Sequence, residues 1–160
     1  EHDAFLGRMD KMHQIENQAD CAKHDMTQRL VHEFITPIER EDIFALAESR
    51  NEPPFILVCD EIADPHNLGA ILRTAECAGA HGVVIPKRRS VGLTAAVGKA
   101  SAGAVEYMKV ARVSNLAGAI DRLKDEGLWI AGADMEGTEM TKADLKGAIG
   151  LVIGLSLIHI

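Results

Sequence analysis

The sequence lacks the features that mark a membrane protein, a disulfide-bonded secreted protein or a generally basic nucleic-acid binder. No apolar run among the 160 residues reaches the length of a membrane span, and the start, Glu1-His2-Asp3, is acidic, unlike the basic region of a signal peptide. Cys21, Cys59 and Cys77 are odd in number and show no CxxC spacing, which predicts reduced thiols, with neither a disulfide framework nor a metal site. The net charge of −7 argues against a chain that is basic throughout. We therefore expect a single cytoplasmic chain with no membrane partner.

Two nucleotide-binding motifs are also missing. No GxGxxG follows the first predicted strand and no P-loop lysine motif occurs, which excludes the ordinary Rossmann and P-loop sites. From residue 55 onward, apolar strands instead alternate with helices, and Gly79, Gly127 and Gly147 punctuate their ends. This alternation predicts an α/β fold with a mostly parallel, doubly wound sheet that has helices on both faces. The expected strands are 55–59, 82–85, 109–113, 128–133 and 149–153, and the expected helices are 67–79, 93–101 and 115–126.

The segment after the first strand carries two polar residues of interest, Asn67 and Arg73. The run 55–60 is apolar and ends in a carboxylate, as is typical of a buried parallel strand, and Pro65 suits the first turn of the helix that follows. Asn67 and Arg73 are six residues apart, so they share no helical face unless Asn67 lies in the capping turn at the mouth of the helix. Taken alone, Asn67 could be a helix cap and Arg73 a solvated surface charge.

A basic triplet, Lys87-Arg88-Arg89, directly follows the predicted strand 82–85. Open α/β folds bind their ligands at the carboxyl ends of parallel strands, so the triplet lies where a ligand is expected. It is a candidate for contacts with nucleic-acid phosphates, and a solvated loop is the alternative.

Several motifs occur in one order along the chain: Asn67-Leu68-Gly69-Ala70-Ile71-Leu72-Arg73-Thr74-Ala75 with Gly79 after it, then 82–94, 99–104, 113–116 and 128–134. Together they resemble the SpoU/TrmH (SPOUT) family of RNA 2'-O-ribose methyltransferases over roughly residues 46–154. Members of that family transfer a methyl group from S-adenosylmethionine to a ribose 2'-hydroxyl of tRNA or rRNA, and they are usually homodimers. The implied fold is the SPOUT type, with a carboxyl-terminal trefoil knot.

The resemblance also implies roles for particular residues. Asn67 and Arg73 correspond to catalytic positions, and the Lys87-Arg88-Arg89 loop to an RNA contact. Gly132, Ala133, Asp134 and Gly154 fall where the family binds S-adenosylmethionine. Glycine suits such a site because a side chain would block the close approach of backbone to ligand, although a turn at the end of a strand needs glycine equally.

Arg73 can assist the reaction in two ways. Methyl transfer to a 2'-hydroxyl needs an aligned attack on the sulfonium methyl and help in losing a proton of high pKa. Arginine is a poor general base because its guanidinium stays protonated. Either an unusual site displaces that proton, or Arg73 stabilises the forming alkoxide electrostatically, which we favour. Asn67 would orient Arg73 or the ribose through its amide.

The chain departs from the family pattern after Gly154. The family's second and third motifs should follow there, but residues 155–160 form an apolar segment that we interpret as a non-native tail. Without the third motif we expect the knot to be incomplete. We also expect S-adenosylmethionine to bind weakly or not at all, and the chain to be inactive.

Residues 1–45 differ in kind from the rest. Apolar residues that recur every three or four positions predict a long amphipathic helix in need of a helical partner: Phe5, Met9, Met12, Ile15, Ala19, Ala22, Met26 and Leu30. This segment resembles helices of PhoU-like phosphate-transport regulators. One face of the predicted helix carries Glu16, Asp20 and His24. These residues could form a metal site, but we favour the alternative that they are a solvated acidic stripe.

Three functional alternatives follow. The first is an RNA methyltransferase core over 46–154, the second a helical phosphate-regulation or metal-binding module over 1–45, and the third an α/β domain that binds RNA without catalysis. The two resemblances meet near residue 45.

Overall fold

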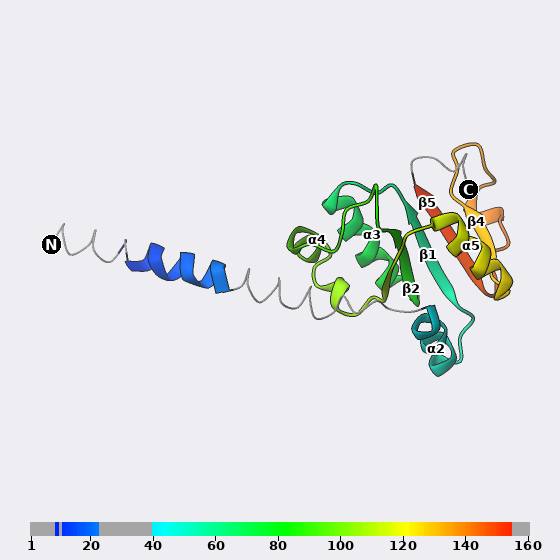
Figure 1. The fold of residues 1–160 in the computed structure, drawn as a ribbon, viewed down its shortest axis with the longest axis horizontal. Coiled ribbons are helices and arrows are strands. Elements are labelled where there is room, and N and C mark those ends of the chain that lie inside the picture. Colours follow the sequence, from blue (N-terminus) through cyan, green and yellow to red (C-terminus); the bar gives the residue numbers. More distant parts are fainter. Residues whose placement is uncertain (1–8, 10, 23–39, 155–160) are drawn as a thin grey trace.

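The computed structural model describes residues 9, 11–22 and 40–154. Its centre is a five-stranded sheet in which every pair of neighbouring strands is parallel, in the order β3-β2-β1-β5-β4 (Figure 1). The strands are β1 (Phe55–Asp60), β2 (Gly82–Pro86), β3 (Val110–Val113), β4 (Trp129–Gly132) and β5 (Ile149–Gly154). The parallel sheet predicted from the alternating pattern is therefore confirmed.

Helices cover both faces of this sheet, as a doubly wound fold requires. One face carries α3 (Pro65–Cys77), α4 (Ala95–Ala100) and the 3₁₀ turn η1 (Ala104–Glu106), and the other carries α2 (Arg40–Arg50) and α5 (Leu116–Asp125). A second 3₁₀ turn, η2 (Met140–Lys142), lies in the connection between β4 and β5. The long crossover from β3 to β4 passes by way of α5, so the chain reaches the far edge of the sheet before returning to pair β5 with β1.

Strand β1 is the centre of the core because both of its faces are buried. Its side chains alternate: Leu57 and Cys59 pack with α3 and α4, while Ile56 and Val58 pack with α2 and α5. Burial raises the pKa of the Cys59 thiol to about 12, so this cysteine is neutral at physiological pH and cannot act as a nucleophile. All three cysteines are free thiols.

Helix α3 begins two residues earlier than the sequence predicted. Asp64 is its N-cap, with a carboxylate oxygen that accepts a hydrogen bond from the Asn67 backbone N–H at 3.0 Å, and Pro65 occupies the first helical position. Gly79 follows the helix with a φ of +75°, a conformation that glycine adopts at little cost. The observed helix therefore gains residues 65 and 66 at its amino end and ends at Cys77, two residues before the predicted end.

Gly69 explains why α3 and α4 lie so close together. A Cβ atom at this position would meet the Ala100 Cβ at 2.5 Å and the backbone of Ala100 and Ser101 at 2.9 Å. Any side chain there would push the two helices apart.

Helix α2 includes residue 45, near which the PhoU-like resemblance ends and the SpoU/TrmH resemblance begins. Ile43, on the amino-terminal side of that point, is buried against the sheet with 2% of its surface exposed, and Ala47, on the other side, is buried equally. The core-forming segment therefore extends back at least to Ile43. The division of the chain at residue 45 stays a prediction.

Part of the predicted amphipathic helix is described. Residues 11–22 are helical, and their side chains are all exposed, including Met12 and Ile15 at 65% and 61%. Phe5, Met26, Leu30 and His24 lie outside the described residues, as does the tail 155–160 that bears on the predicted knot.

Candidate functional site

The residues expected to bind the cofactor meet at one edge of the sheet, where the strands have their carboxyl ends. Gly132 ends β4 and pairs with Val152 of β5, and Gly154 ends β5 beside Asp60, the last residue of β1. Ligands of open parallel sheets bind outside this edge. The structure thus brings Gly132, Ala133, Asp134 and Gly154 to the edge of the sheet where a ligand is expected (Figure 1).

The turn after β4 is exposed and partly tied down. The Ala133 backbone N–H donates to the Val152 carbonyl at 2.9 Å, which holds the turn against β5. The Asp134 Oδ1 accepts a hydrogen bond from the Glu136 N–H at 2.9 Å, so this carboxylate organises its own turn. Its second oxygen accepts no hydrogen bond from any described residue, and the small Gly132 and Ala133 beside it are exposed.

Strand packing within the protein explains why residue 154 is a glycine. A Cβ atom at this position would lie 2.7 Å from the Asp60 carbonyl oxygen and 2.8 Å from the Asp60 Cβ. The close approach of β5 to β1 therefore requires glycine, independently of any ligand.

The structure does not bring Asn67 and Arg73 together. Asn67 is in the first turn of α3 and exposed, at the same edge as the turn after β4. Arg73 is exposed too, but six residues on it lies about 9 Å further along the helix and about 120° around its axis. In the part of the chain that the structure describes, the Arg73 guanidinium has no hydrogen bond or ion pair. Asn67 is thus placed to act on a ligand at this edge rather than on Arg73.

The basic loop after β2 is joined to the loop after β1. The Lys87 N–H donates to the Val113 carbonyl at 2.7 Å, and the Ser90 hydroxyl donates to the Ile62 carbonyl at 3.0 Å. Arg89 forms an ion pair with Glu61 at 3.2 Å between its Nη1 and the Glu61 Oε1. These contacts make one surface of the two loops.

Arg89 and Glu61 also share a backbone feature. Both have a positive φ, +61° for Arg89 and +52° for Glu61, although neither is glycine. Such conformations cost on the order of 1 kcal/mol each and concentrate at functional sites. Two joined strained residues at this edge of the sheet mark the loops as a candidate binding surface.

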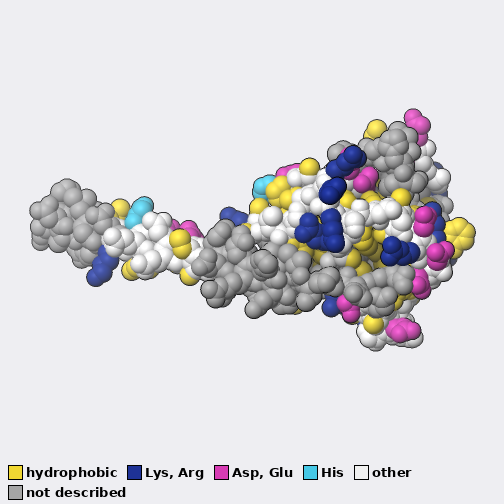
Figure 2. All heavy atoms as spheres, viewed as in Figure 1, with side chains coloured by type: hydrophobic (Ala, Val, Ile, Leu, Met, Phe, Trp, Pro, Cys, Tyr) yellow, Lys and Arg dark blue, Asp and Glu magenta, His cyan; other side chains and the backbone are white. Residues whose placement is uncertain are grey.

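The three cations of the triplet differ in how their charge is compensated. Arg89 is paired with Glu61, whereas the side chains of Lys87 and Arg88 are exposed and form no hydrogen bond or ion pair with any described residue. Figure 2 shows Lys and Arg side chains gathered over the middle of the body on the face in view, with many of the acidic side chains toward its margin. Positive charge without a protein counter-ion favours an anionic ligand.

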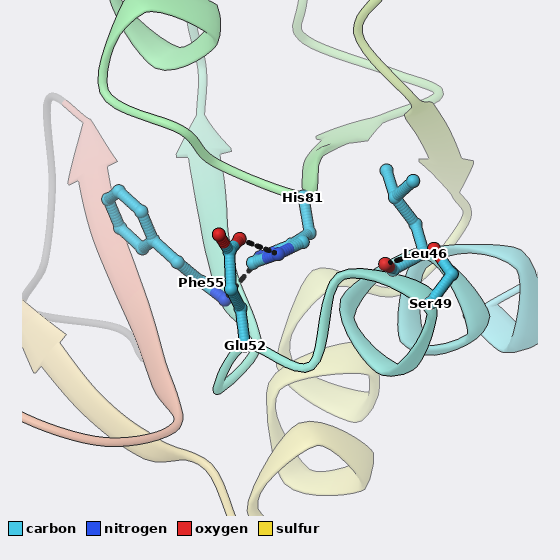
Figure 3. A network of polar contacts seen from close by, with 5 residues as sticks. All are labelled: Leu46, Ser49, Glu52, Phe55 and His81. Atoms are coloured by element: carbon cyan, nitrogen blue, oxygen red, sulfur yellow. Dashed lines mark hydrogen bonds and ion pairs between the residues drawn. The ribbon is translucent and has the colours of Figure 1, made fainter.

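Sequence reasoning overlooked a polar network at the opposite, amino edge of the sheet (Figure 3). His81 is 2% exposed, its Nδ1 accepts a hydrogen bond from the Phe55 N–H at 3.0 Å, and its Nε2 lies 3.2 Å from the Glu52 Oε2. Because Nδ1 is an acceptor, the ring proton is on Nε2 and points to Glu52. The only signal in the sequence is a polar residue directly before an apolar strand.

Nearby, the Ser49 hydroxyl donates to the Leu46 carbonyl at 2.7 Å within α2, just before the chain turns to Glu52. This bond is local to the helix. The amino edge therefore joins α2, β1 and the start of β2 through satisfied hydrogen bonds.

The metal site predicted as one alternative for the amino-terminal segment is not found in the described part of the chain. Among the described residues, no group of three or more His, Cys, Asp or Glu side chains could hold a metal ion. Glu16 and Asp20 are exposed, and His24, the third residue of the predicted group, lies outside the described residues. None of the helices that the structure describes is long and apolar enough to cross a membrane.

A relative from Bacillus subtilis (strain 168), which bears the name "Putative TrmH family tRNA/rRNA methyltransferase YacO", is 51% identical over 117 residues. That match covers 72% of this chain and 47% of the relative. The chain spans about half the length of this relative and of a similar one from Staphylococcus saprophyticus.

Solved structures agree with the fold. A crystal structure of an RNA 2'-O ribose methyltransferase superposes with a TM-score of 0.56 at 27% identity, over 64% of this chain and 39% of the other. An AdoMet-bound rRNA methyltransferase from Sinorhizobium meliloti does so with a TM-score of 0.56 at 25% identity, over 62% of this chain and 38% of the other.

The model of the SpoU rRNA Methylase family matches residues 54–155, which includes all five strands and both loops of the candidate site. The match covers well over half of the chain, and the parallel sheet has the arrangement of solved members. The chain belongs to the SpoU rRNA methylase family.

Proposed function

We propose that residues 54–154 form the core of an enzyme that transfers a methyl group from S-adenosylmethionine to a ribose 2'-hydroxyl of tRNA or rRNA. The observation that carries this proposal is that Asn67, the turn 132–134 and the basic loop 87–89 all lie at the carboxyl edge of a sheet that belongs to this family. Relatives and solved structures with the matching names support the substrate and the cofactor.

The residues at this edge suit a nucleoside cofactor. Gly132 and Ala133 are small and exposed, and the Asp134 carboxylate can accept hydrogen bonds from ribose hydroxyls, as carboxylates do in other nucleotide sites. When bound, S-adenosylmethionine supplies an electrophilic methyl group on a sulfonium. Asn67, in the first turn of α3, would orient the ribose through its amide.

Arg73 would stabilise the alkoxide that forms as the 2'-hydroxyl loses its proton. Its guanidinium is exposed and pairs with no residue that the structure describes, so its charge is available to a substrate. Within one chain, however, Arg73 lies along α3 away from the edge that carries residues 132–134. A second copy of the chain could bring Arg73 to that edge, and we include a homodimer in the proposal.

Lys87 and Arg88 would hold the phosphates that flank the target ribose. Both lie in a loop tied to β3 through the Lys87 N–H and to the loop after β1 through Ser90, so their backbone is held in place before RNA binds. Arg89 contributes less because Glu61 already neutralises it.

A chimera tests the proposed function with the flanking segments supplied by a relative. Residues 54–154 replace the matching segment of the Bacillus relative, and methyl transfer from tritiated S-adenosylmethionine to unmodified tRNA and rRNA is measured. We expect transfer by the chimera, and Arg73→Ala to lower it by at least about 100-fold because the alkoxide loses its stabilising charge. Cofactor binding, measured by calorimetry, should be unchanged.

Arg122→Ala, which removes an exposed arginine from α5, is the matched control and should leave methyl transfer unchanged. Normal turnover by the Arg73→Ala chimera would overturn the role of Arg73. A folded chimera that transfers no methyl group, beside an active parent, would overturn the proposed activity of this core.

A further inference from the structure

Arg112 is a fourth cation at the carboxyl edge, and no sequence motif pointed to it. It lies in β3, where it pairs in register with Ile85 of β2, one residue before Val113. Its neighbours in the strand, Ala111 and Val113, pack with α2 and α5, so side-chain alternation places Arg112 on the opposite face, with α3 and α4.

The guanidinium of Arg112 is held in place without being neutralised. The Nε atom is buried and has no hydrogen-bond partner among the residues that the structure describes. Nor does any described residue form an ion pair or side-chain hydrogen bond with the rest of the group. A buried N–H of a charged group without an acceptor is unfavourable.

The loop after β2 covers Arg112. A Cβ atom built on Gly92 would lie 3.7 Å from its Nη2 and 3.9 Å from its Nη1, which is ordinary van der Waals contact. The same loop carries Lys87, whose N–H continues the β2–β3 ladder to Val113. If the alternation of β2 continues by one residue, Lys87 lies on the same face of the sheet as Ile85 and Arg112.

Arg112 and Arg89 differ in whether a carboxylate compensates their charge. Arg89 has Glu61 at 3.2 Å and a side chain that is 82% exposed, so water and a carboxylate already solvate it. Arg112 is partly buried and has no carboxylate partner among the described residues, while Lys87 and Arg88 add positive charge that no described residue compensates. Uncompensated cations beside a packed guanidinium make a surface that attracts an anion.

We propose that Arg112 binds a backbone phosphate of the RNA substrate and, with Lys87, sets the position of the strand at the carboxyl edge. The inference rests on the proposed RNA substrate. Guanidinium suits this role because its planar N–H groups can bind two oxygens of one phosphate, which an ammonium cannot do with fixed geometry. Its packing under the loop at Gly92 limits its freedom before binding, so less entropy is lost when the phosphate binds.

The test is RNA binding by the 160-residue chain, measured by fluorescence anisotropy with a labelled, unmodified tRNA transcript across a KCl series. Arg112→Gln keeps most of the side chain and removes the charge. We expect it to weaken binding about tenfold and to reduce the slope of log affinity against log salt by about 0.7–0.9, as the loss of one phosphate contact predicts. Arg112→Lys should restore the slope but only part of the affinity, because it restores charge without the planar fork.

Arg122→Gln is the matched control, since it removes the same charge from α5, and it should change neither the affinity nor the slope by a comparable amount. Thermal unfolding of each variant shows whether the sheet is intact. If Arg112→Gln unfolds, the charge-preserving Arg112→Lys still tests the proposal, because equal affinity to the parent chain would contradict a role for the fork.

The outcomes separate this proposal from the function on which it rests. Salt-dependent binding by the parent chain with an unchanged slope in Arg112→Gln overturns the role of Arg112 alone. A parent chain that does not bind the transcript overturns the RNA substrate and this inference together, whereas loss of methyl transfer in the Arg73 chimera does neither. Competition by inorganic phosphate that exceeds competition by chloride at equal ionic strength, and that disappears in Arg112→Gln, would assign the site to free phosphate and overturn the proposal.

Discussion

The two edges of the parallel sheet are built differently. At the amino edge, the buried His81 uses both of its ring nitrogens, one for the Phe55 N–H and one for Glu52. At the carboxyl edge, Lys87, Arg88 and Arg112 have no side-chain partner among the described residues. Both edges are polar, but these three cations of the carboxyl edge, unlike His81, have no side-chain partner in the part of the chain that the structure describes.

The difference separates a contribution to the stability of the fold from a contribution to ligand binding. A satisfied buried network stabilises the native state, because removing one member leaves another without a partner. Cations without a protein partner contribute little to stability and strained loop residues lower it, so both become favourable mainly with a ligand. We therefore expect substitutions at the amino edge to change stability, and substitutions at the carboxyl edge to change RNA binding.

The largest effect on stability is expected at His81. His81→Ala leaves the Phe55 N–H without its acceptor and creates a cavity, which should lower the free energy of unfolding by about 2–4 kcal/mol. Urea denaturation followed by circular dichroism measures this change. In His81→Asn, the amide oxygen can take the place of Nδ1 as the acceptor for the Phe55 N–H. This variant should recover about half of the lost stability, because the bond to Phe55 is more buried than the bond to Glu52.

A His81→Ala chain as stable as the parent would remove the contrast between the edges. Asn and Ala variants of equal stability would show that packing of the ring, rather than its bond to Phe55, is what stabilises the amino edge.

A smaller stability effect and a clear binding effect are expected from the double substitution Lys87→Gln, Arg88→Gln. Neither side chain has a partner among the described residues, so the free energy of unfolding should change by less than about 0.5 kcal/mol. The salt slope of tRNA binding should fall by about 1.4–1.8, as expected when two phosphate contacts are lost. Anisotropy and thermal unfolding on the same samples separate the two quantities, and a destabilised chain with normal binding would reverse the comparison.

The smallest effect is expected at the Arg89–Glu61 pair. Arg89 is 82% exposed and Glu61 37%, so solvent screens their attraction. A double-mutant cycle with Arg89→Gln and Glu61→Gln should give a coupling free energy of about 0.2–1 kcal/mol that diminishes with added salt. A larger, salt-insensitive coupling would mean that the carboxyl edge also contributes to folding, as the amino edge does.

Most of the sheet could be predicted from the sequence because its strands are short apolar runs and its helices end at recognisable residues. Gly79, Gly127 and Gly147 all have a positive φ, as their predicted roles at caps and turns require. The errors lie at helix ends: the helix expected over 115–126 begins at Leu116, because the Asn115 side chain caps it. Such a shift follows from one hydrogen bond that periodicity does not resolve.

The candidate site was predictable only in part. The basic loop and the turn after β4 were located from their positions after strands, and both lie at the carboxyl edge. Arg112 and His81 were missed because a single polar residue in or before an apolar strand has no periodic signal. Their significance depends on partners that are distant in sequence, such as Phe55, which lies 26 residues from His81.

The sequence by itself determined the order of strands and helices and the family of the core, because apolar periodicity, turn glycines and motif spacing are local properties of the chain. The tertiary structure alone decided which side chains share an edge and which of them are neutralised. It placed Asn67 at the same edge of the sheet as the turn after β4, and it showed that the backbone of Asp60 requires glycine at position 154. Those facts depend on distances between segments far apart in the chain, and strand pairing and helix packing set those distances.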